Sequence, residues 1–94
     1  MAIETTVWDP ADRLKTREDE LAYLEAAFED GDPALIAAAF GDVARARGKS
    51  KVAQEAGISR DALYKAFTHN GNPTLASLTK VANALGYRLT IAVA

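Results

Sequence analysis

The sequence predicts a mainly α-helical domain of about five helices that ends in a short β-strand. Several segments carry apolar residues at helical spacing and are bounded by capping residues and glycines. One stretch, SKVAQEAGISRDALYKAFT at 50–68, holds two short helical patterns separated only by Gly57 and Ile58. The last residues, YRLTIAVA, alternate apolar with polar or small side chains, as a strand with one apolar face requires.

The length and composition fit one globular domain. The chain has 94 residues, of which 49% are apolar and 26% are charged. It has no cysteine, which excludes disulfides and thiolate metal sites and agrees with a reducing compartment. No apolar run reaches the ~20 residues of a membrane span, and MAIETTVWD lacks the basic and apolar stretches of a signal peptide. We therefore expect a cytoplasmic protein without a membrane partner.

Charge is distributed unevenly along the chain. Residues 1–47 include eleven acidic and five basic side chains, a net charge of −6, whereas residues 48–94 include two acidic and six basic ones, a net charge of +4. An acidic half joined to a basic half suggests two different partners. The alternative is ordinary unevenness of surface charge.

The N-terminal residues predict an extended arm followed by a short turn. Ile3, Thr5 and Val7 alternate with polar side chains and Trp8, which suits a short strand or an arm. In DPADRL, Asp9 is the expected N-cap and Pro10 the first helical residue. Trp8 either binds a partner or folds back onto the helices of its own chain.

Two longer helices follow. Thr16 caps the first, and the acids from Glu18 to Glu20 lie in its first turn, where we expect them to be solvated. Gly31 ends this helix, and Asp32-Pro33 begins the next, which Gly48 ends. The apolar stripes of the two helices are formed by Leu21, Leu24, Ala27 and Phe28 and by Leu35, Ile36, Ala39, Phe40, Val43 and Ala44.

The stretch at 50–68 predicts a helix-turn-helix. Val52, Ala53 and Ala56 lie on one face of the first short helix, and Leu63 and Ala66 on one face of the second. Gly57 lies where the chain reverses, and Ser59 is placed to cap the second helix. Two helices that cross steeply through such a short turn form this motif, although a plain helical hairpin is the structural alternative.

The second short helix leaves a polar, partly basic face uncovered, which suits the major groove of DNA. We expect side chains at its start and along this face to read bases. The first short helix and the loop before the next helix should hold phosphates, in part through helix N-terminal amides. The predicted DNA-binding residues are Ser50, Lys51, Ser59, Arg60, Asp61, Tyr64, Lys65, Asn72 and Thr74.

The C-terminal region predicts one more helix and the strand. Thr74 caps the helix, Leu75, Leu78, Val81, Ala82 and Leu85 form its apolar side, and Gly86 ends it. The apolar face of the strand is formed by Tyr87, Leu89, Ile91 and Val93, the predicted dimerisation residues. The strand pairs either with residues 3–8 or with its copy in a second chain, which we favour, or it remains an unpaired tail packed on the helices.

The chain resembles the HigA-like addiction-module antidotes, a group of small phage-repressor-like antitoxins. The motifs that carry the resemblance are EDGDPALIAAA, GISRDALYKAF and GNPTLASLTKVANALGYRL, and the similarity runs from about Glu4 to Val93. The resemblance implies a lambda-repressor-like fold and a homodimer that binds the double-stranded DNA operator of its own operon. It also implies that the protein neutralises a RelE/HigB-like toxin, usually an mRNA-cutting ribonuclease.

We therefore divide the chain by expected role. Residues 1–31 form an arm and an acidic helix that bind the partner, with Val7, Trp8, Leu21, Leu24 and Phe28 as candidate contacts. Residues 32–94 form the DNA-binding domain with its dimerisation strand. The alternatives are a prophage-type repressor or a protein-interaction module, in both cases without a toxin partner.

The sequence does not predict an enzyme. His69 is the only histidine and lies in a polar loop, so no second histidine or cysteine could complete a metal site with it. No nucleophile–base pair, glycine-rich phosphate loop or paired-carboxylate motif is present. We expect no metal and no cofactor.

Overall fold

The computed structural model describes residues 9–94, and five α-helices lie in this range. A 3₁₀ helix, η1 (Pro10–Arg13), precedes them. The helices are α1 (Arg17–Asp30), α2 (Pro33–Arg47), α3 (Lys49–Ala56), α4 (Arg60–Ala66) and α5 (Leu75–Ala84). The prediction of a mainly helical domain with about five helices is confirmed. The predicted arm at 3–8, with Val7 and Trp8, lies outside the described residues.

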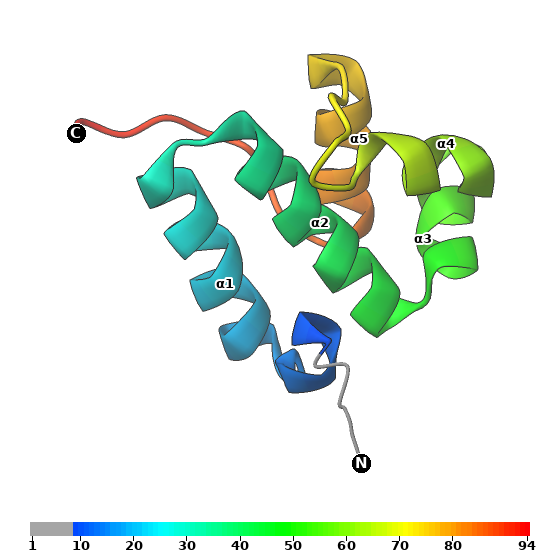
Figure 1. The fold of residues 1–94 in the computed structure, drawn as a ribbon, viewed down its shortest axis with the longest axis horizontal. Helices are drawn as coiled ribbons and strands as arrows, with labels where there is room; N and C mark the ends of the chain where they lie inside the picture. Colours follow the sequence, from blue (N-terminus) through cyan, green and yellow to red (C-terminus); the bar gives the residue numbers. More distant parts are fainter. Residues whose placement is uncertain (1–8) are drawn as a thin grey trace, which may run out of the picture.

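The central element is α2, which contacts η1, α1, α3 and α4 (Figure 1). α1 lies beside α2 and is joined to it by a short turn. α3 and α4 lie on the side of the C-terminal end of α2, and α5 packs against α3. All five helices contribute to one core, in which Phe40, Val43, Leu63, Val81 and Leu85 are the largest fully buried side chains. Leu24 and Ala27 of α1 belong to the same core. The predicted division into residues 1–31 and 32–94 therefore concerns the roles of two surfaces and not two separate cores.

Local sequence determines where most helices begin, as predicted. The Thr16 hydroxyl accepts a hydrogen bond from the amide of Asp19, whose carboxylate accepts one from the amide of Thr16, which completes a capping box. Asp9, Asp32, Ser59 and Thr74 cap η1, α2, α4 and α5 with their side chains. Each cap satisfies backbone donors that have no partner within the helix.

The turn between α3 and α4 has the predicted left-handed glycine. Gly57 has a φ of 75°, and the amide of Ile58 donates to the carbonyl of Ala53 at 3.1 Å. This hydrogen bond closes the end of α3, and the side chain of Ile58 packs against the core. The chain can therefore restart as α4 within three residues, with Leu63 turned into the core.

A second glycine permits the close approach of α2 to the end of α4. A Cβ atom on Gly41 would lie 1.9 Å from the carbonyl oxygen of Phe67, so no larger residue fits without moving the backbone. The end of α4 is thereby held against the middle of α2, which fixes how far the outer face of α4 projects.

Glu20 corrects the prediction that the first-turn acids of α1 are solvated. Its side chain is 6% exposed and pairs with the guanidinium of Arg47 through contacts of 2.6 and 2.7 Å. The hydroxyl of Tyr87 donates to the same carboxylate at 2.9 Å. A buried carboxylate requires such partners, and these come from the end of α2 and from the segment after α5.

The predicted C-terminal strand is not formed within the described chain. Residues 9–94 contain no strand, and the segment after Gly86 runs as an extended tail. Tyr87 and Leu89 pack against the core, whereas Ile91 and Val93 are 95% and 101% exposed. A strand needs a second backbone to pair with, and no part of the described chain supplies one.

The predicted apolar side of α5 is also shorter than expected. Val81, Ala82 and Leu85 are buried, but Leu75 is 75% exposed because it lies at the first position of the helix, beyond the edge of the core.

Candidate nucleic-acid interface

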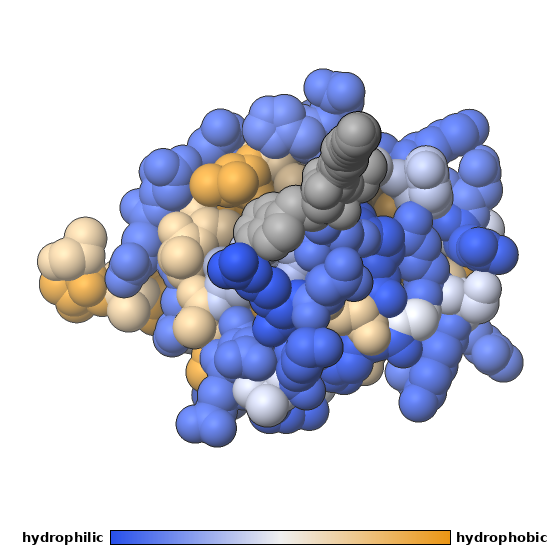
Figure 2. Space-filling model, turned by 60° about the horizontal axis from the view of Figure 1, so that its bottom comes forward, coloured by the Kyte–Doolittle hydropathy of each residue, from blue (hydrophilic) through white to orange (hydrophobic). Residues whose placement is uncertain are grey.

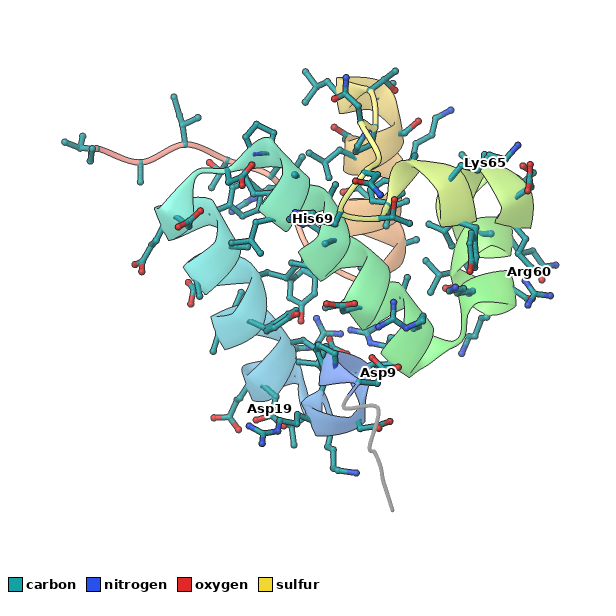
Figure 3. All side chains as sticks on the ribbon, viewed as in Figure 1. Asp9, Asp19, Arg60, Lys65 and His69 are labelled. Atoms are coloured by element: carbon teal, nitrogen blue, oxygen red, sulfur yellow. The ribbon has the colours of Figure 1, made fainter. Side chains whose placement is uncertain are left out.

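The outer face of α4 presents the four predicted base-reading residues to solvent. Arg60, Asp61, Tyr64 and Lys65 are exposed, while Leu63 of the same helix is 2% exposed. Figure 3 shows Arg60 and Lys65 on the side of the molecule away from α1. The structure therefore brings these residues together on one accessible helical face.

Asp61 and Lys65 form an ion pair on this face. The carboxylate oxygen lies 3.2 Å from the ammonium nitrogen, one helical turn away, and both side chains are more than three-quarters exposed (76% and 77%). A pair exposed to this extent contributes little to stability and is easily exchanged for another partner. Lys65 can therefore turn towards a phosphate or a base edge at small cost.

The start of α3 leaves backbone donors available. No side chain caps this helix, unlike α1, α2, α4 and α5 of the described chain. Lys49, Ser50 and Lys51 occupy its first turn, so their amides and cationic side chains share one end of the helix. Such a helix start favours anions through its dipole and its amides.

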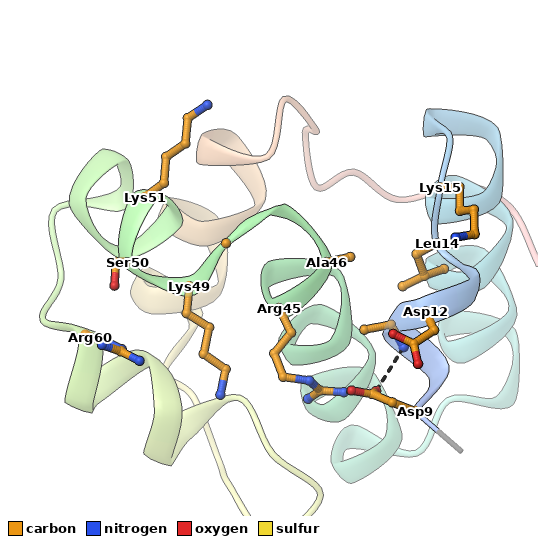
Figure 4. A pocket seen from close by; sticks show the side chains of 12 residues that line it. Asp9, Asp12, Leu14, Lys15, Arg45, Ala46, Lys49, Ser50, Lys51 and Arg60 are labelled. Atoms are coloured by element: carbon orange, nitrogen blue, oxygen red, sulfur yellow. Dashed lines mark hydrogen bonds and ion pairs between the residues drawn. The ribbon is translucent and has the colours of Figure 1, made fainter. Parts of the chain in front are cut away.

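An open groove lies between η1 and the starts of α3 and α4 (Figure 4). Its volume is about 950 Å³, and residues from η1, the end of α2, α3 and α4 line it. The lining includes five basic side chains and two acidic ones, a net charge of +3: Lys15, Arg45, Lys49, Lys51 and Arg60 against Asp9 and Asp12. We call this the basic groove. Figure 2 shows that the face of the molecule turned towards the viewer is largely hydrophilic.

Lys49 links the basic groove to α4. Its ammonium lies 3.9 Å from the centre of the Tyr64 ring, a cation–π contact that orients the exposed tyrosine. Partial burial, followed by the nearby charges of Arg45 and Arg60, lowers the pKa of Lys49. Cations crowded in this way favour the approach of an anion.

Sequence reasoning did not include Lys49 and Arg45 among the site residues. Lys49 directly precedes the predicted Ser50 and Lys51, so its place at the start of α3 could have identified it. Arg45 had no such signal, because its position in the last turn of α2 has an ordinary explanation in the helix dipole.

The remaining predicted DNA contacts lie at caps and in a loop. The hydroxyls of Ser59 and Thr74 accept hydrogen bonds from the amides of Ala62 and Ser77 at 2.9 and 3.0 Å. Asn72 is exposed in the loop before α5. A Cβ atom on Gly71 would meet the carbonyl oxygen of Ala66 at 2.1 Å, so this loop lies against the C-terminal end of α4 and away from Arg60.

The predicted partner contacts on α1 divide into two kinds. Leu21 and Phe28 are 43% and 45% exposed, among exposed acids of the same helix. The Phe28 ring makes an edge-to-face contact with Phe40, which holds it against the core at one edge. Leu24 is 4% exposed and packs in the core, so it does not reach a surface that a partner could contact.

The described residues offer neither a metal site nor a membrane-spanning helix. Within 9–94, no group of three histidine, cysteine or acidic side chains is arranged to hold an ion. The helices in this range are too short or too polar to cross a bilayer. His69 is exposed in the loop after α4.

Comparison with known proteins gives one family and one curated relative. A family model described as "Probable addiction module antidote protein" matches residues 4–93. An uncharacterized protein of Haemophilus influenzae is 42% identical over 84 residues, which cover 89% of this chain and 87% of the relative. No solved structure matches significantly.

Proposed function

The chain belongs to the family of probable addiction module antidote proteins, and we propose that it is the antitoxin of a type II toxin–antitoxin module. In this proposal it neutralises a RelE/HigB-like toxin and represses its own operon as a DNA-binding homodimer in the cytoplasm. It acts by binding rather than by catalysis. The observation that carries the DNA-binding part is the exposed face of α4 beside the basic groove and the uncapped start of α3.

The two short helices have distinct roles in DNA binding. α4 enters the major groove, where Arg60, Tyr64 and Lys65 reach base edges. The first turn of α3 holds the sugar-phosphate backbone through Ser50, Lys51 and the backbone amides, which sets register more than sequence. Few cations are available to contact DNA, and the chain has a net charge of −2. We therefore expect a moderate affinity for DNA that depends strongly on salt concentration.

The C-terminal tail provides the dimer contact. Ile91 and Val93 are almost fully exposed, and the backbone of residues 88–94 makes no hydrogen bond to another backbone group of the described range. Pairing with the tail of a second copy would satisfy both needs. A two-fold dimer then places two α4 helices in successive major grooves, about 34 Å apart.

The toxin binds the outer face of α1. This face combines two half-exposed apolar anchors, Leu21 and Phe28, with exposed Glu18, Glu25 and Glu29. A ribonuclease toxin must hold RNA and therefore carries positive charge, so an acidic face accelerates encounter and excludes acidic competitors. An apolar centre inside a polar rim is the usual arrangement of a protein interface.

Copurification with the protein encoded by the neighbouring gene tests this proposal. The double substitution Leu21→Asp with Phe28→Asp should abolish the complex, because it places two charges at the centre of the contact. Leu75→Asp is a control for a charge added at an exposed leucine elsewhere, since Leu75 is more exposed than either residue and lies on α5. Loss of the complex in the control, or its survival in the double variant, would contradict the proposed toxin surface.

A further inference from the structure

Arg45, at the edge of the basic groove, contacts two carboxylates of the described chain. Its guanidinium lies 2.7 Å from Asp42 on its own helix and 2.6 Å from Asp9, the cap of η1. Asp42 also accepts a hydrogen bond from Tyr23, so it is fixed in place by two partners. Asp9 reaches Arg45 from a different element, and the two side chains meet at the η1 side of the groove, opposite Arg60 (Figure 4).

The position that Asp9 occupies favours an anion. Arg45 and Lys49 point into the groove, and Arg60 lies at its other side (Figure 4). The hydrogen bond from Arg45 is the main cause of the lowered pKa of Asp9, followed by the cap hydrogen bond from the amide of Ala11, with smaller contributions from the charges of Arg45 and Lys49. These cations therefore stabilise whichever anion lies between them.

We propose that the Asp9 carboxylate occupies the binding position of a DNA backbone phosphate, which Arg45 and Lys49 hold once Asp9 withdraws. The inference rests on the proposed DNA binding and adds two phosphate-binding residues and one inhibitory residue to it. A guanidinium has five donors in a planar fork, so Arg45 can retain Asp42 on one edge and receive a phosphate on the other.

Withdrawal of Asp9 breaks its contact with Arg45 and weakens the cap of η1, because the same carboxylate oxygen accepts from the amide of Ala11, but it exposes no side chain of the core. No residue of η1 is buried, and the side chains of Asp9 and Arg45 are 39% and 34% exposed. An ion pair with this exposure is weak, and salt screens it. A phosphate that replaces Asp9 is attracted by all the cations of the groove. Its binding also releases cations condensed on the DNA, which favours the complex.

Asp9 consequently lowers the affinity for every DNA sequence. The phosphate position carries no base information, so removal of the Asp9 charge should strengthen binding to all duplexes alike. The slope of log K against log salt should change little, because the wild type and the variant make the same phosphate contact once DNA is bound.

The test compares Asp9→Asn with Asp12→Asn on a short DNA duplex of arbitrary sequence over a range of salt concentrations. Both variants remove one negative charge from the groove lining, and asparagine caps a helix as well as aspartate does. Asp9→Asn should bind about three- to tenfold more tightly than the wild type, because no carboxylate competes with the phosphate for Arg45. Asp12→Asn should show a smaller gain, because Asp12 has no contact with Arg45.

A second comparison isolates Arg45. In an Arg45→Gln background, Asp9→Asn should have no larger effect than Asp12→Asn, because the competing contact is already absent. If the wild type binds the duplex but the two asparagine variants behave alike, DNA binding stands and the phosphate position is refuted. If neither the wild type nor Asp9→Asn binds any duplex at low salt, the proposed DNA binding itself fails, and the inference fails with it.

Discussion

At the residue scale, Glu20 joins three separate parts of the chain. Its carboxylate accepts two hydrogen bonds from Arg47 and one from Tyr87, and Arg47 also donates to the carbonyl of Leu85 at 3.0 Å. The guanidinium of Arg17 lies 5.2 Å from the centre of the Tyr87 ring. The network ties the start of α1 to the end of α2 and to the base of the C-terminal tail.

Glu20→Gln should destabilise the fold by about 2 kcal/mol at neutral pH, because it leaves the partly buried Arg47 without its counter-charge. The hydrogen bond from Arg47 is the main cause of the lowered pKa of Glu20 relative to its ordinary value of 4.5. The stabilisation is therefore complete above about pH 4.5 and is lost as the pH falls through the lower folded-state pKa. Urea unfolding of both proteins at several pH values should show the difference shrink towards acid pH; a difference independent of pH would contradict the ion-pair role.

The sequence predicts the residues that act locally and misses those that act over distance. Thr16, Asp32, Ser59 and Thr74 cap helices as expected, because a cap depends only on the few residues that follow it. Glu20 has the same local appearance as its solvated neighbours. Its burial depends on Arg47, which is 27 residues away and which no local pattern connects to it.

At the element scale, α3 and α4 should separate affinity from specificity. Arg60→Ala should reduce the preference for the operator over other DNA, with a cost of about 1–3 kcal/mol on the operator alone. Lys51→Ala should weaken binding to all duplexes about equally and reduce the salt slope by about 1. Titrations of operator and unrelated duplexes at several salt concentrations measure both effects, and an even loss across sequences in both variants would contradict the division of roles.

The sequence predicts this pair of helices more completely than the site around it. Small and apolar residues at 52–63, a left-handed Gly57 and the Ser59 cap define the helix pair within one short stretch. The basic groove combines side chains from four elements, so its composition depends on how η1 and α2 pack beside α3. The C-terminal tail is predicted as a strand, but a strand forms only when it pairs with a second backbone. Residues 9–94 contain no such partner, so the tail is extended and unpaired within this range.

At the scale of the whole molecule, the tail projects from the helical body as an uncovered apolar extension (Figures 1 and 2). Its inner part is held by Tyr87 and Leu89, so the outer part has a defined starting point. In the proposed dimer, this anchored extended segment would pair with its copy at low cost in conformational entropy.

Ile91→Asp with Val93→Asp should convert the proposed dimer to a monomer while leaving the helical fold intact, because both side chains are fully exposed in the single chain. Thr90→Asp with Ala92→Asp adds the same charge to the alternate positions of the tail and should leave most of the dimer in place. Light scattering after size-exclusion chromatography measures the mass of each variant. Equal dissociation of both variants would point to general charge repulsion instead of a strand contact.

The growth of cells that express the neighbouring small gene, alone and together with this protein, tests the antitoxin role most directly. The neighbouring gene alone should arrest growth, and coexpression of this chain should relieve the arrest. The acidic face of α1 would then be the surface to map by mutation. Absence of arrest, or arrest that this protein does not relieve, would contradict the antitoxin role and leave the exposed face of α4 to be tested as that of a repressor without a toxin partner.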